Sequence, residues 1–258
     1  MAKLLDKFLG KSRWQALSAA LRTSSSITVE PQLGVDALFV ALLLSVTPIA
    51  LTFWDSARPP GAPSSPLPTL GFGICTLLAF VTRSRLGLPF VRTADWRKSL
   101  SLTHTAVALG CIPAALILVI SKTLLSDRHD TLTRAVGGAS SGSSLGIAGA
   151  IGLVLAIAAW VAVTEEMIFR GTLVSVVRRL RFIPKQWQRD TAAGVLSAVI
   201  FGLAHWPTWG PLPALALVGL GLGFVVGYLA NGEQLLPLIL YHFVFDTLSI
   251  GISLFGIH

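Results

Sequence analysis

The chain has few charged residues, no cysteine framework and no common zinc-protease signature, and each absence excludes a class of protein. Charged residues make up 12% of the chain, about half of the roughly 25% that is usual in soluble domains. The two cysteines, Cys75 and Cys111, lie in apolar segments, so we expect buried thiols. No cysteine pattern indicates a disulfide scaffold or a metal site, and no His-Glu-x-x-His sequence occurs.

Hydrophobic residues are abundant instead, at 53% of 258 residues, and the mean hydropathy is +0.74. Near-continuous apolar runs of this kind are typical of a polytopic membrane protein. The net charge is +8, but the basic residues gather in the segments between apolar runs. This distribution indicates membrane topology and contact with anionic lipid, not nucleic-acid binding.

Seven apolar stretches are candidates for membrane spans. They are Leu33–Phe53, Leu67–Thr82, Leu102–Ile120, Leu145–Thr164 or somewhat later, Thr191–Trp206, Leu212–Ala230 and Leu235–Ile257. The second and fifth are shorter than the ~20 residues of a spanning helix, so they are extended or incomplete. The sequence therefore predicts an all-α bundle with about seven or eight spanning helices.

The segment before the first span is basic and amphipathic. Lys3, Lys7, Lys11 and Arg13 alternate with apolar residues at helical spacing, and no apolar run of signal-peptide type occurs there. We expect residues 1–30 to form an interfacial helix, 31–144 to form N-terminal spans and 145–258 to hold the functional core. Sixteen of the 20 Lys and Arg residues fall on one side of the predicted topology, which favours a cytoplasmic N-terminus.

Two adjacent carboxylates, Glu165 and Glu166, interrupt an apolar stretch, although the whole chain has only four glutamates. A charge at membrane depth costs at least ~2.5–3.5 kcal/mol, so it indicates function. Glu166 and Arg170 are four residues apart and can pair on one helix face. Glu165 points about 100° away and is free to act as a general base toward water. An ion-pair cluster at a helix end is the alternative.

Three more polar residues occur in later apolar segments: His205, His242 and Asp246. His242 and Asp246 are again four residues apart, so a packed polar pair is the alternative to a site. The simplest interpretation is that these acids and histidines line one hydrated pocket. For the groups to meet, the fourth span must shift to about Leu153–Val176, or the fifth must tilt or begin before Thr191.

The order EExxxR (Glu165, Glu166, Arg170), FxxxH (Phe201, His205) and HxxxN/D (His242, Asp246) resembles the CAAX-protease and bacteriocin-processing family of intramembrane proteases. The resemblance covers about Leu145–Phe255. It implies that Glu165 is the catalytic base, that His205, His242 and Asp246 are catalytic, and that Glu166, Arg170 and Phe201 support them. Asp246 takes a position often held by asparagine.

The resemblance implies peptide-bond hydrolysis by Glu-activated water, on a membrane-bound or lipidated peptide or a membrane protein. No cofactor is firmly implied. If zinc is bound, His205, His242, Asp246 and Glu165 are the predicted ligands. We expect an integral protein of a bacterial inner membrane, with its active site open to the cytoplasm and no nucleic-acid partner.

Two other classes of function remain open from the sequence. The chain is a membrane scaffold that has kept the protease motifs, or a transporter with a Glu–His–Asp proton relay. The transporter is the weaker alternative, because Leu33–Phe53 and Leu212–Ala230 hold almost no polar residue and no repeat is visible.

Overall fold

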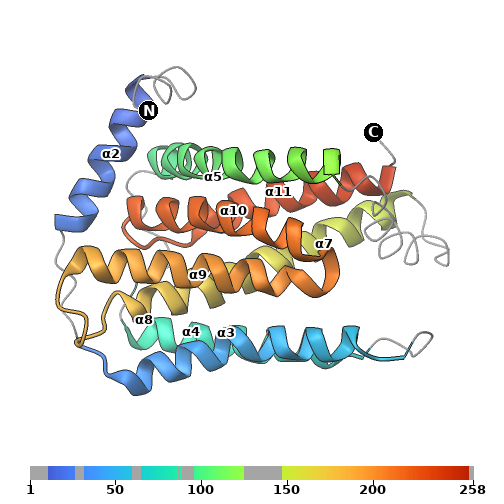
Figure 1. Cartoon of the computed structure of the whole chain (residues 1–258), viewed down its shortest axis with the longest axis horizontal. Coiled ribbons are helices and arrows are strands. Elements are labelled where there is room, and N and C mark those ends of the chain that lie inside the picture. Colours follow the sequence, from blue (N-terminus) through green and yellow to red (C-terminus); the bar gives the residue numbers. More distant parts are fainter. Residues whose placement is uncertain are drawn as a thin grey trace.

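The computed structural model describes residues 11–26, 32–59, 65–86, 88, 96–124 and 147–255, and these residues form a helical bundle (Figure 1). In chain order the helices are α2 (Lys11–Ser26), α3 (Val35–Ser56), α4 (Leu67–Arg85), α5 (Trp96–Leu124), α7 (Ile147–Glu165), the π-helix η2 (Glu166–Val174), α8 (Ser175–Val177), α9 (Gln186–Trp209), α10 (Pro211–Ala230) and α11 (Leu236–Phe255). Within the described ranges, the only β-type pairing is an isolated bridge between Leu33 and Leu180. The predicted all-α fold is confirmed.

Six helical segments of the described chain are long and apolar enough to cross a membrane, and α11 adds a shorter apolar stretch, Leu236–Ser249. The fourth span runs over Ile151–Val177, because α7, η2 and α8 follow one another without a break. The fifth begins at Gln186, before Thr191. Both shifts that the polar residues required are therefore present. The predicted end of the seventh span, Ile257, lies outside the described residues.

Helices α5 and α10 approach each other closely because both helices have glycines in the contact between them. A side-chain carbon added at Gly223 would lie 2.9 Å from the Ala106 carbonyl oxygen and 3.1 Å from the Gly110 Cα atom. Gly219 and Gly227 meet α5 in the same way, at Pro113 and Thr103. The Gly219–Gly223–Gly227 series thus packs inside the fold, as small residues at regular spacing do in membranes.

We expect Gly223→Ala to destabilise the protein, because the added methyl group meets backbone atoms that cannot move aside. Overpacking of this kind costs about 1–3 kcal/mol. Gly152→Ala is the matched control, since nothing lies within 4 Å of the added carbon. Denaturant titration in mixed micelles measures both variants, and equal stability of the two would contradict the packing argument.

Helix α2 lies at one end of the bundle and runs steeply across the direction of the long helices (Figure 1). Leu17 is fully buried and packs with Leu102 and Ala106 of α5, whereas Arg13 is exposed. A helix with one buried face across the end of a membrane bundle fits an interfacial position. The predicted residues Lys3 and Lys7 lie outside the described part of the chain. We call this end, where α2 lies, the basic end.

The main hydrophobic core joins both predicted halves of the chain. Buried residues of the N-terminal spans, such as Leu44 and Ala79, share one cluster with Phe169, Phe201 and Leu238 of the C-terminal part. The boundary expected at residue 144 therefore separates two parts of the sequence that pack around one common core.

Candidate active site

The two adjacent glutamates lie where the helix changes from α to π geometry. Glu165 is the last residue of α7 and Glu166 the first of η2, and every residue of η2 is buried. The hydroxyl of Thr172 donates to the carbonyl oxygen of Met167, and that of Ser175 donates to the carbonyl oxygen of Arg170, each five residues back. π-Helical turns are rare and are frequent at functional sites.

The structure differs from the expectation that the two glutamates serve separate faces of the helix. Glu165 and Glu166 lie on either side of the same imidazole, that of His242. In a π-helix the backbone bonds run from i to i+5, so each residue turns by less than the 100° of an α-helix. Adjacent side chains therefore diverge less and can reach one partner.

Glu166 and Arg170 form the ion pair that their spacing predicted. The Arg170 Nη1 atom lies 3.2 Å from Glu166 Oε1, and both side chains are 0% exposed. The guanidinium also donates to the Gly221 carbonyl oxygen and lies over the rings of Phe201 and Phe224, at 4.4 Å and 5.1 Å from their centroids. A buried charge needs this many partners, because water is not there to solvate it.

His242, on α11, is the central residue of the site. Its Nδ1 atom lies 2.8 Å from Glu166 Oε1. That oxygen also accepts from Arg170, so it acts as an acceptor here and Nδ1 carries the hydrogen. The Nε2 atom faces two other carboxylates, Glu165 at 3.6 Å and Asp246 at 3.4 Å. His242 is therefore fixed in orientation, with Nε2 directed into the group of acids.

His205, on α9, approaches Glu165 from the other side. Its Nδ1 atom lies 2.9 Å from the carbonyl oxygen of Phe201, one turn back. A carbonyl only accepts, so Nδ1 carries a hydrogen, and in the neutral ring Nε2 is the acceptor. That Nε2 atom lies 3.7 Å from Glu165 Oε1. The rings of Phe201 and Trp209, four residues before and after His205 on α9, lie 4.9 Å and 5.6 Å from its ring, measured between centroids.

The structure thus brings together all seven residues that the sequence singled out, from α7, η2, α9 and α11. Glu165 Oε2 and Asp246 Oδ2 are buried and have no hydrogen-bond partner within the described chain. Separations of 3.4–3.7 Å among these polar atoms are longer than direct hydrogen bonds. The site therefore places three carboxyl groups and two imidazoles beside one guanidinium, which contacts Glu166.

Comparison with known protein families places this geometry in context. Residues 147–248 match the family described as Type II CAAX prenyl endopeptidase Rce1-like. This segment is similar to the CAAX-protease domain. No curated protein and no solved structure gave a significant match to the chain. The family resemblance read from the three motifs is therefore confirmed for the C-terminal part of the chain.

The residues that the sequence predicts as ligands of a metal ion, Glu165, His205, His242 and Asp246, lie together in this segment. Both imidazoles offer Nε2 while Nδ1 is held by a second group, which is usual for metal ligands and equally for water-binding histidines. The described residues contain no group of three or more His, Cys, Asp or Glu side chains arranged to hold a metal ion. The zinc ligands expected from sequence stay a prediction.

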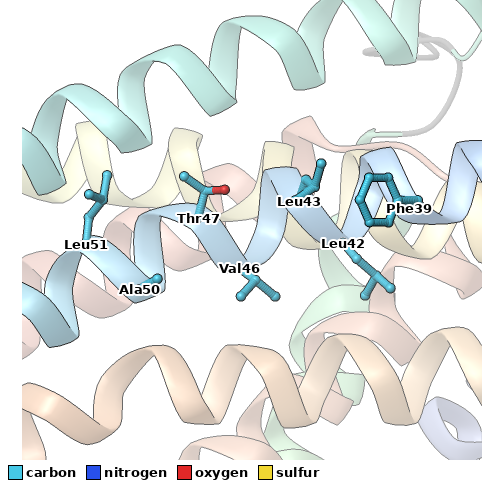
Figure 2. A pocket seen from close by; sticks show the side chains of 7 residues that line it. All are labelled: Phe39, Leu42, Leu43, Val46, Thr47, Ala50 and Leu51. Carbon is cyan, nitrogen blue, oxygen red and sulfur yellow. The ribbon is translucent and has the colours of Figure 1, made fainter.

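Two hollows on the surface of the described bundle have no acidic residue in their lining. One, of about 460 Å³, is lined only by α3 residues such as Phe39 and Val46, as Figure 2 shows. A second, of about 300 Å³, lies between α4 and α7 and is lined by Phe80, Trp160 and Met167 among others. Both are almost wholly apolar, and both are formed by spanning helices. Neither lining contains a side chain suited to water activation.

Sequence reasoning missed a second group of buried charges at the basic end. Glu233 is 5% exposed and Arg178 2%, and their side chains are joined by a 2.7 Å contact. The available signal was that Glu233 is one of only four glutamates and stands between two apolar spans.

Proposed function

We propose that the chain is an intramembrane endopeptidase that hydrolyses a peptide bond with water activated by Glu165. One observation carries the proposal: Glu165 lies within 3.7 Å of the Nε2 atoms of both His205 and His242, inside a span. The match of residues 147–248 to CAAX-type endopeptidases supports it. The substrate is a membrane-bound or lipidated peptide, or a membrane protein.

In the proposed reaction Glu165 takes a proton from water as the oxygen attacks the scissile carbonyl carbon. His205, whose Nε2 accepts, orients that water. His242 in its protonated form donates from Nε2 to the oxyanion that develops, and Glu166 and Asp246 balance its charge. When the C–N bond breaks, Glu165 returns the proton to the leaving amine, so one water gives one acid and one amine.

For orientation, we propose that the basic end faces the cytoplasm of a bacterial inner membrane. Arg178 and Arg179 lie there beside the end of the fourth span, and α2 covers the same end with its basic residues. Positive residues are retained on the cytoplasmic side. His242 is six residues beyond the start of α11, about 9 Å along that helix. A substrate therefore reaches the site from the cytoplasmic side.

The direct test uses the purified full chain in proteoliposomes with two membrane-bound peptides, one prenylated and ending in a CAAX sequence, the other a single-span peptide without lipid. The reaction is run in H₂¹⁸O and the products are identified by mass spectrometry. We expect cleavage of at least one peptide, with one ¹⁸O atom in the new carboxyl group. Folded protein that cleaves neither peptide would favour the scaffold alternative. Peptide-independent proton flux would favour the transporter.

The same assay distinguishes a metal enzyme from a metal-free one. We expect that 1,10-phenanthroline and its non-chelating 1,7-isomer leave the rate equal, because the proposed proton transfers use only side chains of the chain. A selective loss of activity with the chelating isomer, restored by added zinc, would assign the metal to Glu165, His205, His242 and Asp246.

A further inference from the structure

A buried ionic cluster at the basic end joins the turn before α11 to the helix that carries the two glutamates. Its centre is Glu233, in the short connection between α10 and α11. The Glu233 carboxylate lies 2.7 Å from Nη1 of Arg178 through Oε1 and 2.7 Å from Nη2 of Arg179 through Oε2. Both arginines directly follow α8, which continues from η2.

The backbone of Glu233 also makes two hydrogen bonds within the cluster. Its carbonyl oxygen accepts from Arg83 of α4, and its N–H donates to the carbonyl oxygen of Tyr228 at 3.0 Å. Its φ is +66°, a left-handed conformation that is unfavourable for a residue with a side chain. Such a conformation persists where surrounding contacts over-determine it. The cluster therefore specifies the path of this turn.

Two further contacts lie beside the cluster, one between α10 and α8 and one between the connection and the π-helix. The hydroxyls of Tyr228 and Ser175 lie 2.8 Å apart. Leu235 is fully buried, and its side chain would lie 3.0 Å from a carbon added at Gly171 in the middle of η2. Glu233 thus holds the connection before α11 against the end of the fourth span, and Leu235 holds it against η2. Tyr228 joins the last turn of α10 to α8.

The position of this turn decides how deep α11 places its polar residues. His242 follows the first residue of α11 by six positions, and Glu166 is the first residue of η2. A displacement of the turn along η2 moves the His242 imidazole away from Glu165 and Glu166, because a helix transmits a shift along its axis. The distances of 2.8 Å and 3.6 Å to these acids leave little room for such a shift.

The charge of Glu233 is maintained by its arginine partners. Burial by itself raises the pKa of this carboxyl group, but hydrogen bonds and charge from Arg179, together with the charge of Arg178, outweigh burial and hold the pKa below its usual value. Glu233 is therefore ionised at neutral pH and available to both arginines.

We infer that Glu233 is a positioning residue, which holds α11 in the register that sets His242 between Glu165 and Glu166. The inference deepens the proposed function and rests on it for its kinetic consequence. Its structural consequence, the register of α11 against the fourth span, is independent of any reaction.

The test compares Glu233→Gln with Asp190→Asn in the full chain. Asp190 pairs with the same Arg178, at 2.7 Å, but belongs to α9 and does not touch the turn. We expect Glu233→Gln to lower kcat about ten- to a hundredfold, the effect of a misplacement of ~1 Å. We expect KM to stay within about twofold, because the loss concerns the transition state. Asp190→Asn is expected to leave kcat within about twofold.

A second measurement reports the register of α11 against the fourth span and does not depend on hydrolysis. Spin labels are placed at Val244 of α11 and Trp160 of α7, which are 54% and 46% exposed, after replacement of Cys75 and Cys111 by Ala. We expect Glu233→Gln, but not Asp190→Asn, to change the dipolar broadening between the labels. If Glu233→Gln does not fold, Arg179→Gln takes its place, with the same direction of change.

The outcomes distinguish the positioning role of Glu233 from the proposed protease function. Unchanged broadening and unchanged kcat in Glu233→Gln would overturn the positioning role, and so would equal effects of Asp190→Asn. Changed broadening in a protein that hydrolyses no peptide would uphold the positioning role and overturn the proposed function.

Discussion

Glu165→Gln is expected to lower kcat by about 10²–10⁴-fold, which is the contribution of a positioned general base. The amide keeps the size of the side chain but cannot take a proton from water. We expect His242 not to replace it, because its Nδ1 donates to Glu166 and its Nε2 faces Glu165 and Asp246. His205 Nε2 accepts only from the water that it orients in the proposed reaction. The measurement is single-turnover cleavage in proteoliposomes with saturating substrate.

Two controls make this result interpretable. Glu165→Asp keeps the carboxylate but withdraws it by one methylene, so we expect an intermediate rate. Thermal unfolding in detergent should show Glu165→Gln as folded as the wild type, since the side chain is nearly isosteric. A Gln variant within about tenfold of the wild-type rate would contradict the assignment, because a general base contributes more than that.

Arg170→Met is expected to lower the free energy of unfolding by about 3–5 kcal/mol, because it leaves a buried carboxylate without its cation. Arg170 and Glu166 are both 0% exposed, so no water replaces the lost partner. The variant also loses the bond to the Gly221 carbonyl oxygen and the contact with the Phe201 ring. Denaturant titration in mixed micelles measures the effect.

The double variant Glu166→Gln/Arg170→Met tests whether the unpaired charge of Glu166 causes the loss of stability. Removal of both charges should restore part of the lost stability, since it is the unpaired charge that is costly. Arg58→Met is the matched control, because Arg58 pairs with Asp55 where the side chains are 27% and 26% exposed. A surface pair of this kind contributes about 0–1 kcal/mol. Equal losses in Arg58→Met and Arg170→Met would refute the role of burial.

The spans and their polar residues could be predicted from the sequence because hydrophobicity is a local property. Apolar runs gave the helices, and the i,i+4 spacing gave the pairs Glu166–Arg170 and His242–Asp246. The requirement that distant polar groups meet also gave the shifted fourth span and the earlier start of α9. The family resemblance rested on the same residues and is confirmed over residues 147–248.

The π-helix and the Glu233 cluster could not be predicted in this way. Hydropathy does not distinguish an i→i+4 from an i→i+5 backbone bond, so the sequence placed Glu165 on a different face from Glu166. Glu233 has no periodic relation to Arg178 or Arg179, which precede it by 55 and 54 residues. Contacts between such distant residues exist only after the helices have packed.

The sequence by itself determined that this chain is a membrane bundle with acids and histidines in its C-terminal spans, because the cost of burying charge restricts where such residues are retained. Only the tertiary structure decided that Glu165 and Glu166 share one imidazole, and that a buried turn at Glu233 holds α11 in place. These features depend on the register between helices, and register is set by side-chain packing and backbone geometry that no single segment specifies.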